Sequence, residues 1–174
     1  MSKSLSKQFY RYYASSNLSS YKGLAVMLVH MQDKFLIDLH GDDEQQLYRS
    51  QSKVIQELCV ESCVPLINVL YYRCGPVAYT LREYINVAPL VESISKKSAN
   101  AFMKNYRLNS LLEQMEITTL FIMGIYATGC LISTSKGGKD NDFKIITAGD
   151  VMADPKDVSS RYDKIKYNDI LKKY

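Results

Sequence analysis

Apolar runs alternate along this chain with amphipathic stretches. The runs at 23–30, 64–71 and 120–125 are almost wholly apolar and rich in branched side chains, which is the pattern of strands buried on both faces of a parallel sheet. Two weaker runs, at 91–96 and 143–147, predict further strands.

Between these runs, apolar residues recur at the spacing of a helix. Leu47, Val54, Ile55 and Leu58 form one apolar stripe and predict a helix over about 44–61. Further helices are predicted over 79–85, from Asn105 or Asn109 to residue 115, from Cys130 to about residue 138, and from about residue 157.

This order of elements indicates the fold class. Strands that alternate with helices are joined by right-handed crossovers into a parallel sheet. We therefore predict an α/β fold with three α/β/α layers and a doubly wound, mostly parallel sheet. Ligands of such sheets bind at the carboxyl ends of the strands. His30, Lys96 and Cys130 stand at or just past such ends, so we expect these three side chains at one edge of the sheet.

The length of the chain limits its domain organisation. The 174 residues suit one domain. Apolar residues between Leu5 and Tyr13 fall on one helical face, and a serine-rich stretch follows them. We predict an N-terminal helical arm over 1–22 and a single α/β domain over 23–174.

Charge is concentrated at the two ends of the chain. Residues 1–22 carry a net +4 and residues 161–174 a net +3, whereas the whole chain carries only +4. The body between them is therefore slightly acidic, at about −3, which argues against a nucleic-acid groove built into the fold. No apolar run is long enough to span a membrane.

Cysteine and motif content exclude several other classes. The four cysteines form no C-x-x-C pair, so neither a disulfide framework nor a zinc site is indicated, and we expect a reducing, cytoplasmic location. Two histidines make a histidine-rich metal site improbable. Neither G-x-G-x-x-G nor a phosphate loop occurs, so we expect no cofactor and no metal.

The segment 117–134 combines a buried strand, a turn and a helix start. Gly124 permits a sharp turn, and the small residues 127–129 allow close approach of a ligand to the backbone. Cys130 then falls near a helix N-terminus, where the dipole and free amides favour a thiolate. Two interpretations remain open on this local evidence, a reactive thiol or a buried structural cysteine.

Four segments carry a resemblance to a known family. They are Val29-His30-Met31-Gln32-Asp33-Lys34-Phe35, Lys96-Lys97-Ser98-Ala99-Asn100-Ala101-Phe102, the spacing from Gly124 to Cys130-Leu131, and the strand Ile145-Ile146-Thr147-Ala148-Gly149 before Asp150. On these segments the chain, from about Gly23 to Asp154, resembles the isochorismatase-like cysteine hydrolases. That family includes nicotinamidases and N-carbamoylsarcosine amidases.

The resemblance implies a Rossmann-like fold and a cysteine-dependent hydrolase. Cys130 would be the nucleophile toward a small amide, or a related C–N or vinyl-ether bond, with Lys96 stabilising its thiolate. The backbone N–H groups of Tyr126 and Cys130 would form an oxyanion hole, aided by a cis peptide before Tyr126. Phe35 and Phe102 would contribute to binding of the small-molecule substrate.

One position departs from the family pattern. The family has its catalytic Asp where this chain has His30. A neutral imidazole with a pKa of about 6.5 can accept a thiol proton, although repulsion by Lys96 would oppose the imidazolium. The alternative is a catalytically degenerate pseudoenzyme that serves as a binding or assembly module.

Tyrosines suggest self-association. Fourteen tyrosines occur in the chain, and aromatic residues of this kind favour interfaces. Because members of the resembled family commonly assemble, we expect a homo-oligomer. The tyrosines concerned are Tyr10, Tyr12, Tyr13, Tyr71 and Tyr72.

Overall fold

A computed structural model describes residues 21–37, 39 and 41–154. Most of the predicted arm at 1–22 lies outside the described residues, as does the end of the chain from 155 to 174. In the part of the chain that is described, no helix has the length and apolarity needed to cross a membrane.

The core of the fold is a six-stranded sheet in which every pairing of named strands is parallel. The strand order is β3-β2-β1-β4-β5. The sixth strand, β6, pairs with the carboxyl end of β4, past the part of β4 that pairs with β5. The five predicted strands are confirmed, whereas the two-residue β6 is too short to leave a periodic signal. The strands are β1 (Leu24–Val29), β2 (Leu66–Tyr71), β3 (Val91–Lys96), β4 (Thr119–Ile125), β5 (Lys144–Ile146) and β6 (Met152–Ala153).

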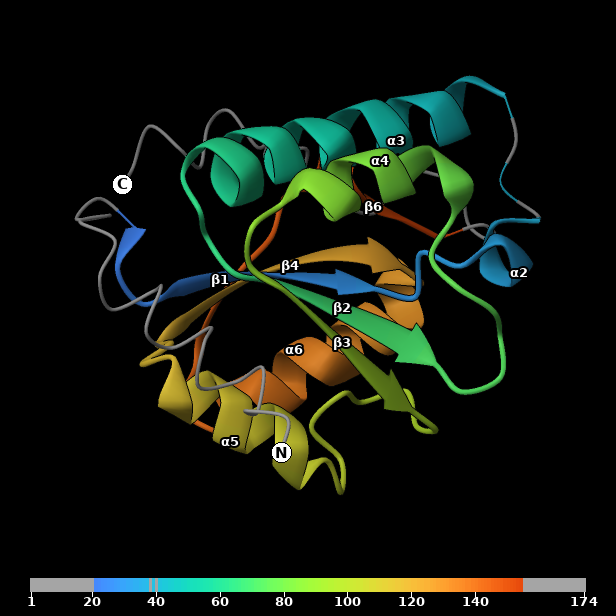
Figure 1. The fold of residues 1–174 in the computed structure, drawn as a ribbon. Coiled ribbons are helices and arrows are strands. Elements are labelled where there is room, and N and C mark those ends of the chain that lie inside the picture. The colour runs from blue at the N-terminus through green and yellow to red at the C-terminus, as the bar shows by residue number, and fades with distance from the viewer. Residues whose placement is uncertain (1–20, 38, 40, 155–174) are drawn as a thin grey trace, which may run out of the picture.

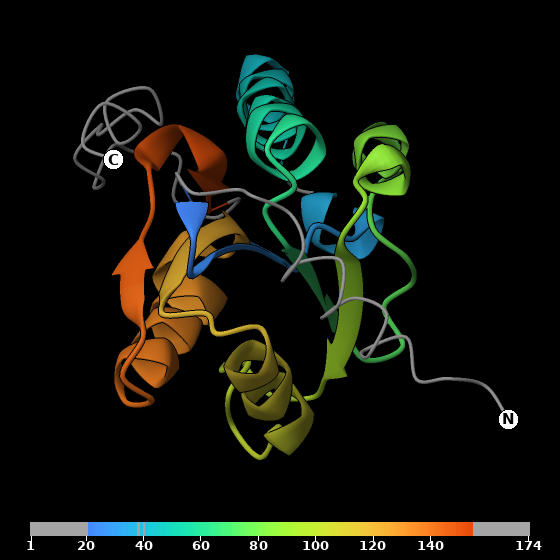
Figure 2. The same cartoon turned by 60° about the vertical axis from the view of Figure 1, so that its left-hand side comes forward.

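Helices cover both faces of the sheet, which confirms the predicted three layers. Figure 1 shows α3 (Asp42–Val54) and α4 (Tyr79–Val87) above the strands, and α5 (Tyr106–Gln114) and α6 (Ile132–Lys139) below them. The rotated view in Figure 2 shows the same separation. The remaining helical segments are α2 (Asp33–Leu36), the π-helical η2 (Ile55–Glu61) and η3 (Ala127–Leu131), and the 3₁₀ turn η4 (Gly149–Val151).

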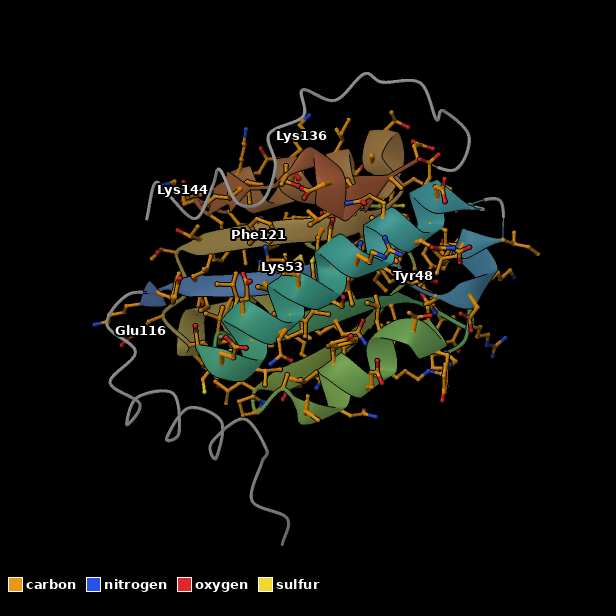
Figure 3. The ribbon with its side chains drawn as sticks, turned by 90° about the horizontal axis from the view of Figure 1, so that it is seen from above. Tyr48, Lys53, Glu116, Phe121, Lys136 and Lys144 are labelled. Carbon is orange, nitrogen blue, oxygen red and sulfur yellow. The ribbon has the colours of Figure 1, made fainter. Side chains whose placement is uncertain are left out.

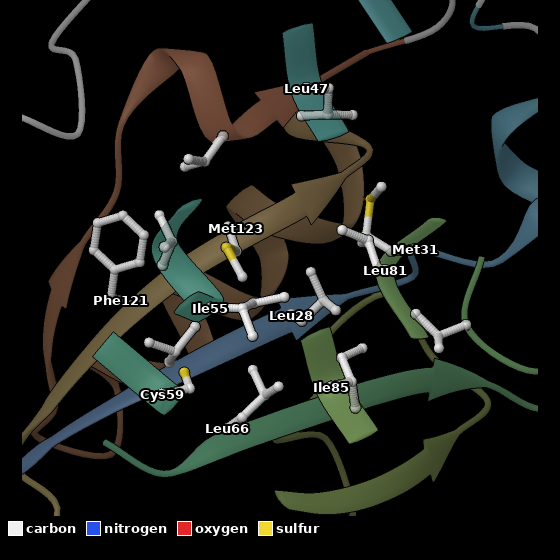
Figure 4. Packing of buried hydrophobic residues seen from close by; sticks show 14 of the residues in the cluster. Leu28, Met31, Leu47, Ile55, Cys59, Leu66, Leu81, Ile85, Phe121 and Met123 are labelled. Carbon is white, nitrogen blue, oxygen red and sulfur yellow. The ribbon is translucent and has the colours of Figure 1, made fainter. Parts of the chain in front are cut away.

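The predicted helix over 44–61 is observed as α3 followed directly by η2. Its four stripe residues are all buried, and α3 lies across the sheet in Figure 3. In Figure 4, Ile55 from this segment lies beside Leu28 of β1 and Met123 of β4. Burying a side chain of this size contributes roughly 1.5–3 kcal/mol, so this face holds the segment on the sheet.

The carboxyl ends of β1 and β4 approach each other very closely at one glycine. Val29 pairs with Gly124 in the parallel register. Gly124 has a φ of +133°, and a Cβ built on it would lie 2.9 Å from the backbone carbon and nitrogen of Val29. Only glycine allows this approach without displacement of the backbone. As a result, His30 and Tyr126, which follow the two strands, emerge at the same edge.

Candidate functional site

The strand order brings three of the predicted site residues to one edge of the sheet. His30 follows β1, Lys96 ends β3, and Cys130 lies in η3 directly after β4. Lys96 has electrostatic interactions with both His30 and Cys130, although β2 separates its strand from β1. The long lysine side chain therefore lies near enough to both other groups to interact with them electrostatically.

The turn that carries Cys130 is fixed by its own backbone. The peptide bond between Ile125 and Tyr126 is cis, as the resemblance implies. The carbonyl oxygen of Tyr126 accepts hydrogen bonds from the N–H groups of Gly129 at 3.1 Å and Leu131 at 3.0 Å. These bonds close the turn around Cys130, which is a free, half-buried thiol.

Asp154 anchors the same turn from the end of β6. Its side chain is only 8% exposed, and its Oδ2 atom accepts hydrogen bonds from the Thr128 N–H at 3.1 Å and from the Thr128 hydroxyl. Sequence reasoning matched Asp150 to the family pattern and missed this role of Asp154. The signal for it was weak, since β6 has only two residues.

Lys96 is buried, and the loop that follows it is tied to α6. Its side chain is 5% exposed, and Nζ donates a hydrogen bond to the carbonyl oxygen of Ala99. The hydroxyl of Thr134, on α6, donates to the same oxygen at 3.2 Å and accepts from the N–H of Ala101 at 3.2 Å. Burial lowers the pKa of Lys96 to about 8, and the neighbouring Cys130 opposes this shift.

His30 lies in an aromatic box and is 0% exposed. Its ring stacks on Phe35 with a centroid distance of 5.3 Å and meets Tyr71 edge-on at 5.3 Å. The ring of Phe35 in turn meets Tyr126 at 6.0 Å. Neither imidazole nitrogen has a hydrogen-bond partner among the described residues.

The surroundings of His30 determine its charge. Burial, and then the positive charge of Lys96, lowers the pKa of His30 to about 3. The imidazole is therefore neutral at physiological pH. A neutral imidazole has one donor and one acceptor nitrogen, and both are buried in His30.

Gln32 positions the aromatic box, a role that sequence reasoning also missed. Its Oε1 accepts a hydrogen bond from the Tyr71 N–H at 2.6 Å, while Nε2 donates to the carbonyl oxygens of Tyr71 and Gly75. These bonds join the segment after β1 to the end of β2. A glutamine directly after a buried apolar strand was the available signal.

The two predicted substrate-binding phenylalanines lie in different places. Phe35 forms part of the box around His30. Phe102 packs against Phe143 at a centroid distance of 5.7 Å, within the hydrophobic cluster that includes the buried leucines of α5. Phe102 is therefore in a core-packing position, and the structure does not bring its ring into the box.

The arrangement combines a thiol, a buried cation and a neutral aromatic wall. A thiol beside an ammonium group is more easily ionised and becomes a nucleophile. No group of three or more His, Cys, Asp or Glu side chains suited to a metal ion occurs in residues 21–37, 39 and 41–154. The thiol and the amine are the reactive groups that this edge of the sheet brings together.

Comparison with known proteins gives matches in structure. No family model and no curated protein matches the sequence. The nicotinamidase of Staphylococcus aureus has a TM-score of 0.68 and 20% identity over 77% of this chain and 86% of its own. An isochorismatase of Pseudomonas putida has a TM-score of 0.65 and 17% sequence identity. The match covers 94% of this chain and 88% of the isochorismatase.

A third solved structure, described as the MAR1 ribonuclease of Caenorhabditis elegans, has a TM-score of 0.67. Its sequence identity is 16%, over 78% of this chain and 67% of its own. At these identities the likeness concerns the arrangement of helices and strands, which is the arrangement that the resemblance of the four segments predicts. The chain has the α/β fold of isochorismatases and nicotinamidases.

Proposed function

We propose that this protein is a cysteine-dependent hydrolase of a small amide, or of a related C–N or vinyl-ether bond, with Cys130 as the nucleophile. The observation that carries the proposal is the electrostatic contact between Cys130 and the buried amine of Lys96. The fold shared with isochorismatases and nicotinamidases supports a hydrolase. The fixed turn around Cys130 supports a nucleophile held in one orientation.

Lys96 is the better proton acceptor of the two basic groups. A general base works best when its pKa lies near the working pH. The pKa of Lys96 is lowered to about 8, whereas that of His30 is lowered to about 3. We therefore assign proton transfer to Lys96 and give His30 the role of a neutral wall and hydrogen-bonding group.

For an amide, the reaction has two steps. The Cys130 thiol transfers its proton to the Lys96 amine, and the thiolate attacks the carbonyl carbon, with the N–H groups of Tyr126 and Cys130 as the oxyanion donors. The C–N bond breaks, and the leaving amine takes the proton from Lys96. Water then hydrolyses the thioester, which releases the acid and restores the thiol. In this scheme Phe35 contacts the substrate, and Phe102 supports the loop after Lys96 through the core.

A catalytically degenerate binding module is the second candidate. The observation that favours it is His30, whose two ring nitrogens are buried without partners and whose pKa is too low for a base at neutral pH. A site that has lost its base can still hold a small molecule. Activity of the parent and of His30→Asp on a panel of small amides separates the two candidates. Activity gained only in His30→Asp supports degeneration.

Alkylation with iodoacetamide tests the nucleophile directly. Mass spectrometry follows each cysteine between pH 5 and 9, and the half-buried Cys63 serves as the internal reference. We expect Cys130 to react at least tenfold faster than Cys63 at pH 7, because an ordinary thiol with a pKa of about 8.5 is then mostly protonated. Lys96→Met should remove the advantage. Equal rates at Cys130 and Cys63 would refute the proposed nucleophile.

A homo-oligomer in the cytoplasm stays a prediction. Of the tyrosines that suggested self-association, Tyr10, Tyr12 and Tyr13 lie outside the described residues. Tyr71 belongs to the aromatic box, while Tyr72 is 41% exposed. Light scattering at micromolar concentration measures the mass of the particle, and a monomer would contradict the prediction.

A further inference from the structure

We propose that the substrate of this site carries a carboxylate, which binds between Lys96 and the neutral ring of His30. The inference deepens the proposed function, on which it rests, because it assigns the substrate class of the same site. It derives from the charges that the site contains and from the hydrogen-bonding atoms that it leaves unused.

Lys96 is a buried cation without a carboxylate partner in the described part of the chain. The ion pairs there join Lys53 to Glu57, Arg82 to Asp33 and Arg107 to Glu92. Lys96 instead donates to a neutral backbone carbonyl, that of Ala99. A buried charge that is not balanced by an opposite charge is costly, so an anion bound beside Lys96 is stabilising.

The groups around Lys96 do not supply that anion permanently. The low pKa of His30 keeps its ring neutral, and the carboxylate of Asp154 already accepts two hydrogen bonds from Thr128. The thiolate of Cys130 balances Lys96 only after the thiol has lost its proton. While the thiol keeps its proton, a protonated Lys96 has no opposite charge beside it, and a neutral substrate would not supply one.

A carboxylate on the substrate supplies the opposite charge that a protonated Lys96 lacks while the thiol is neutral. One of its oxygens accepts a hydrogen bond from the Lys96 ammonium group, and the other accepts from the N–H of the neutral His30 ring. Such charge-assisted hydrogen bonds are short and strong. The bond to His30 would also satisfy a buried donor that has no other partner among the residues described.

Two exposed cations lie near the same strand ends. Arg73 and Lys97 approach the ring of Tyr72, with the guanidinium carbon 5.0 Å and the ammonium nitrogen 4.6 Å from its centroid. Tyr72 follows β2 and its N–H bonds to the carbonyl oxygen of Lys96. Positive charge gathered in one place raises the local concentration of anions, so these cations favour the approach of a carboxylate to these strand ends.

Iodoacetate and iodoacetamide provide a test with matched shapes. Both alkylate a thiolate and release iodide, but iodoacetate carries a carboxylate where iodoacetamide carries a neutral amide. Mass spectrometry gives the ratio of the two rates at Cys130 and at Cys63 in the same sample. We expect the iodoacetate-to-iodoacetamide ratio to be at least tenfold higher at Cys130 than at Cys63.

Variants at the two binding groups distinguish the source of this preference. His30→Asp places a carboxylate beside Lys96, and Lys96→Met removes the cation, so each should lower the ratio at Cys130 to that of Cys63. His30→Asn keeps a neutral donor and should retain most of the preference. A ratio in the parent equal to that of Cys63, or a preference that survives both His30→Asp and Lys96→Met, would overturn the inference.

The proposed nucleophile is tested by the absolute rate of iodoacetamide labelling at Cys130, and not by the ratio of the two rates. Fast iodoacetamide labelling without a preference for iodoacetate refutes the carboxylate site and leaves the nucleophile intact. If Cys130 reacts with neither reagent, the proposal that Cys130 is the nucleophile is refuted. The anion site is then tested separately, by comparing the change in Tm that sodium propionate causes with the change that propionamide causes at the same ionic strength. A larger stabilisation by propionate in the parent than in Lys96→Met supports the site, and equal stabilisation refutes it.

Discussion

The turn after β4 and the end of β1 meet at the same edge of the sheet, but they are held in different ways. In the turn, the Tyr126 carbonyl accepts two backbone hydrogen bonds and Asp154 accepts two from Thr128. At the end of β1, the backbone of His30 is hydrogen-bonded on both sides, to Val69 at 2.9 Å and to Gln32 at 2.7 Å. Its ring packs against Phe35 and Tyr71 and has no hydrogen bond among the residues described.

The two regions therefore differ in what their structure fixes: one fixes the position of the thiol, and the other leaves polar atoms available for binding. Hydrogen bonds with fixed directions orient the backbone around the thiol, whereas ring packing holds the imidazole by shape and leaves its nitrogens unused. The first arrangement suits a nucleophile that must not move. The second suits a group whose polar atoms bind a ligand.

The largest effect is expected where the two regions touch, at Gly124. Gly124→Ala places a Cβ against the backbone of Val29 at a φ of +133°, so strain and overpacking together should lower the free energy of unfolding by about 3–5 kcal/mol. Gly41→Ala is the matched control, because Gly41 also has a positive φ, of +70°, but no atom of the described residues lies within 4 Å of its Cβ position.

Urea denaturation of the two variants measures the contrast. Gly41→Ala should cost about 1–3 kcal/mol, the cost of a backbone with φ +70° and ψ −139°, a region that residues other than glycine rarely adopt. If Gly124→Ala is no less stable than Gly41→Ala, then β1 and β4 do not require the close approach, and the two regions are not coupled through this glycine.

The fold could be predicted from the sequence because its signals are local and repeated. The runs at 23–30 and 120–125 are long enough to mark buried strands, and the stripe from Leu47 to Leu58 marks a helix. The short segments gave no such signal. The four residues of α2 and the two of β6 are fixed by the sheet to which they attach and not by their own sequence.

The site could be predicted only in part. The spacing from Gly124 to Cys130 and the position of Lys96 after a strand placed both residues correctly at the sheet edge. The bonds of Asp154 to Thr128 and of Gln32 to Tyr71 join residues 26 and 39 positions apart. Such contacts depend on the completed fold, as does the burial that sets the charge of His30.

The second prediction concerns a substitution that weakens only the turn after β4. Asp154→Asn removes the negative charge that accepts the N–H and hydroxyl of Thr128, and it should cost about 2 kcal/mol of stability, as expected for hydrogen bonds to a charged group. Alkylation of Cys130 by iodoacetamide should become several-fold slower, since the turn is less well ordered. Urea denaturation and the labelling rates measure the two effects.

Asp142→Asn is the control for this change. Asp142 is exposed and has a positive φ that Asn tolerates, so its stability should change by no more than about 0.5 kcal/mol. A variant of Asp154 that is as stable as this control would show that the carboxylate does not anchor the turn.

The smallest expected effect concerns the loosely held region and its dependence on pH. The pKa of His30 is lowered from 6.5 to about 3 in the folded protein, so between these values the unfolded chain binds more protons than the folded one. Stability should therefore fall as the pH falls below 6.5. From pH 7.5 to 5.5 the contribution of His30 to this loss is about 1.4 kcal/mol.

His30→Phe isolates that contribution, because a second aromatic ring fills the box without a titratable group. We expect the parent to lose about 1.4 kcal/mol more than His30→Phe between pH 7.5 and 5.5, measured by urea denaturation at each pH. At pH 7.5 the removal of buried polar atoms without partners favours the variant, whereas the positive φ of residue 30, +57°, disfavours Phe, so the test compares the pH dependence of the two proteins and not their absolute stabilities. If the two proteins instead lose stability equally, His30 has an ordinary pKa in the folded state. It would then be able to accept a proton at neutral pH, and the assignment of that step to Lys96 would have to be reversed.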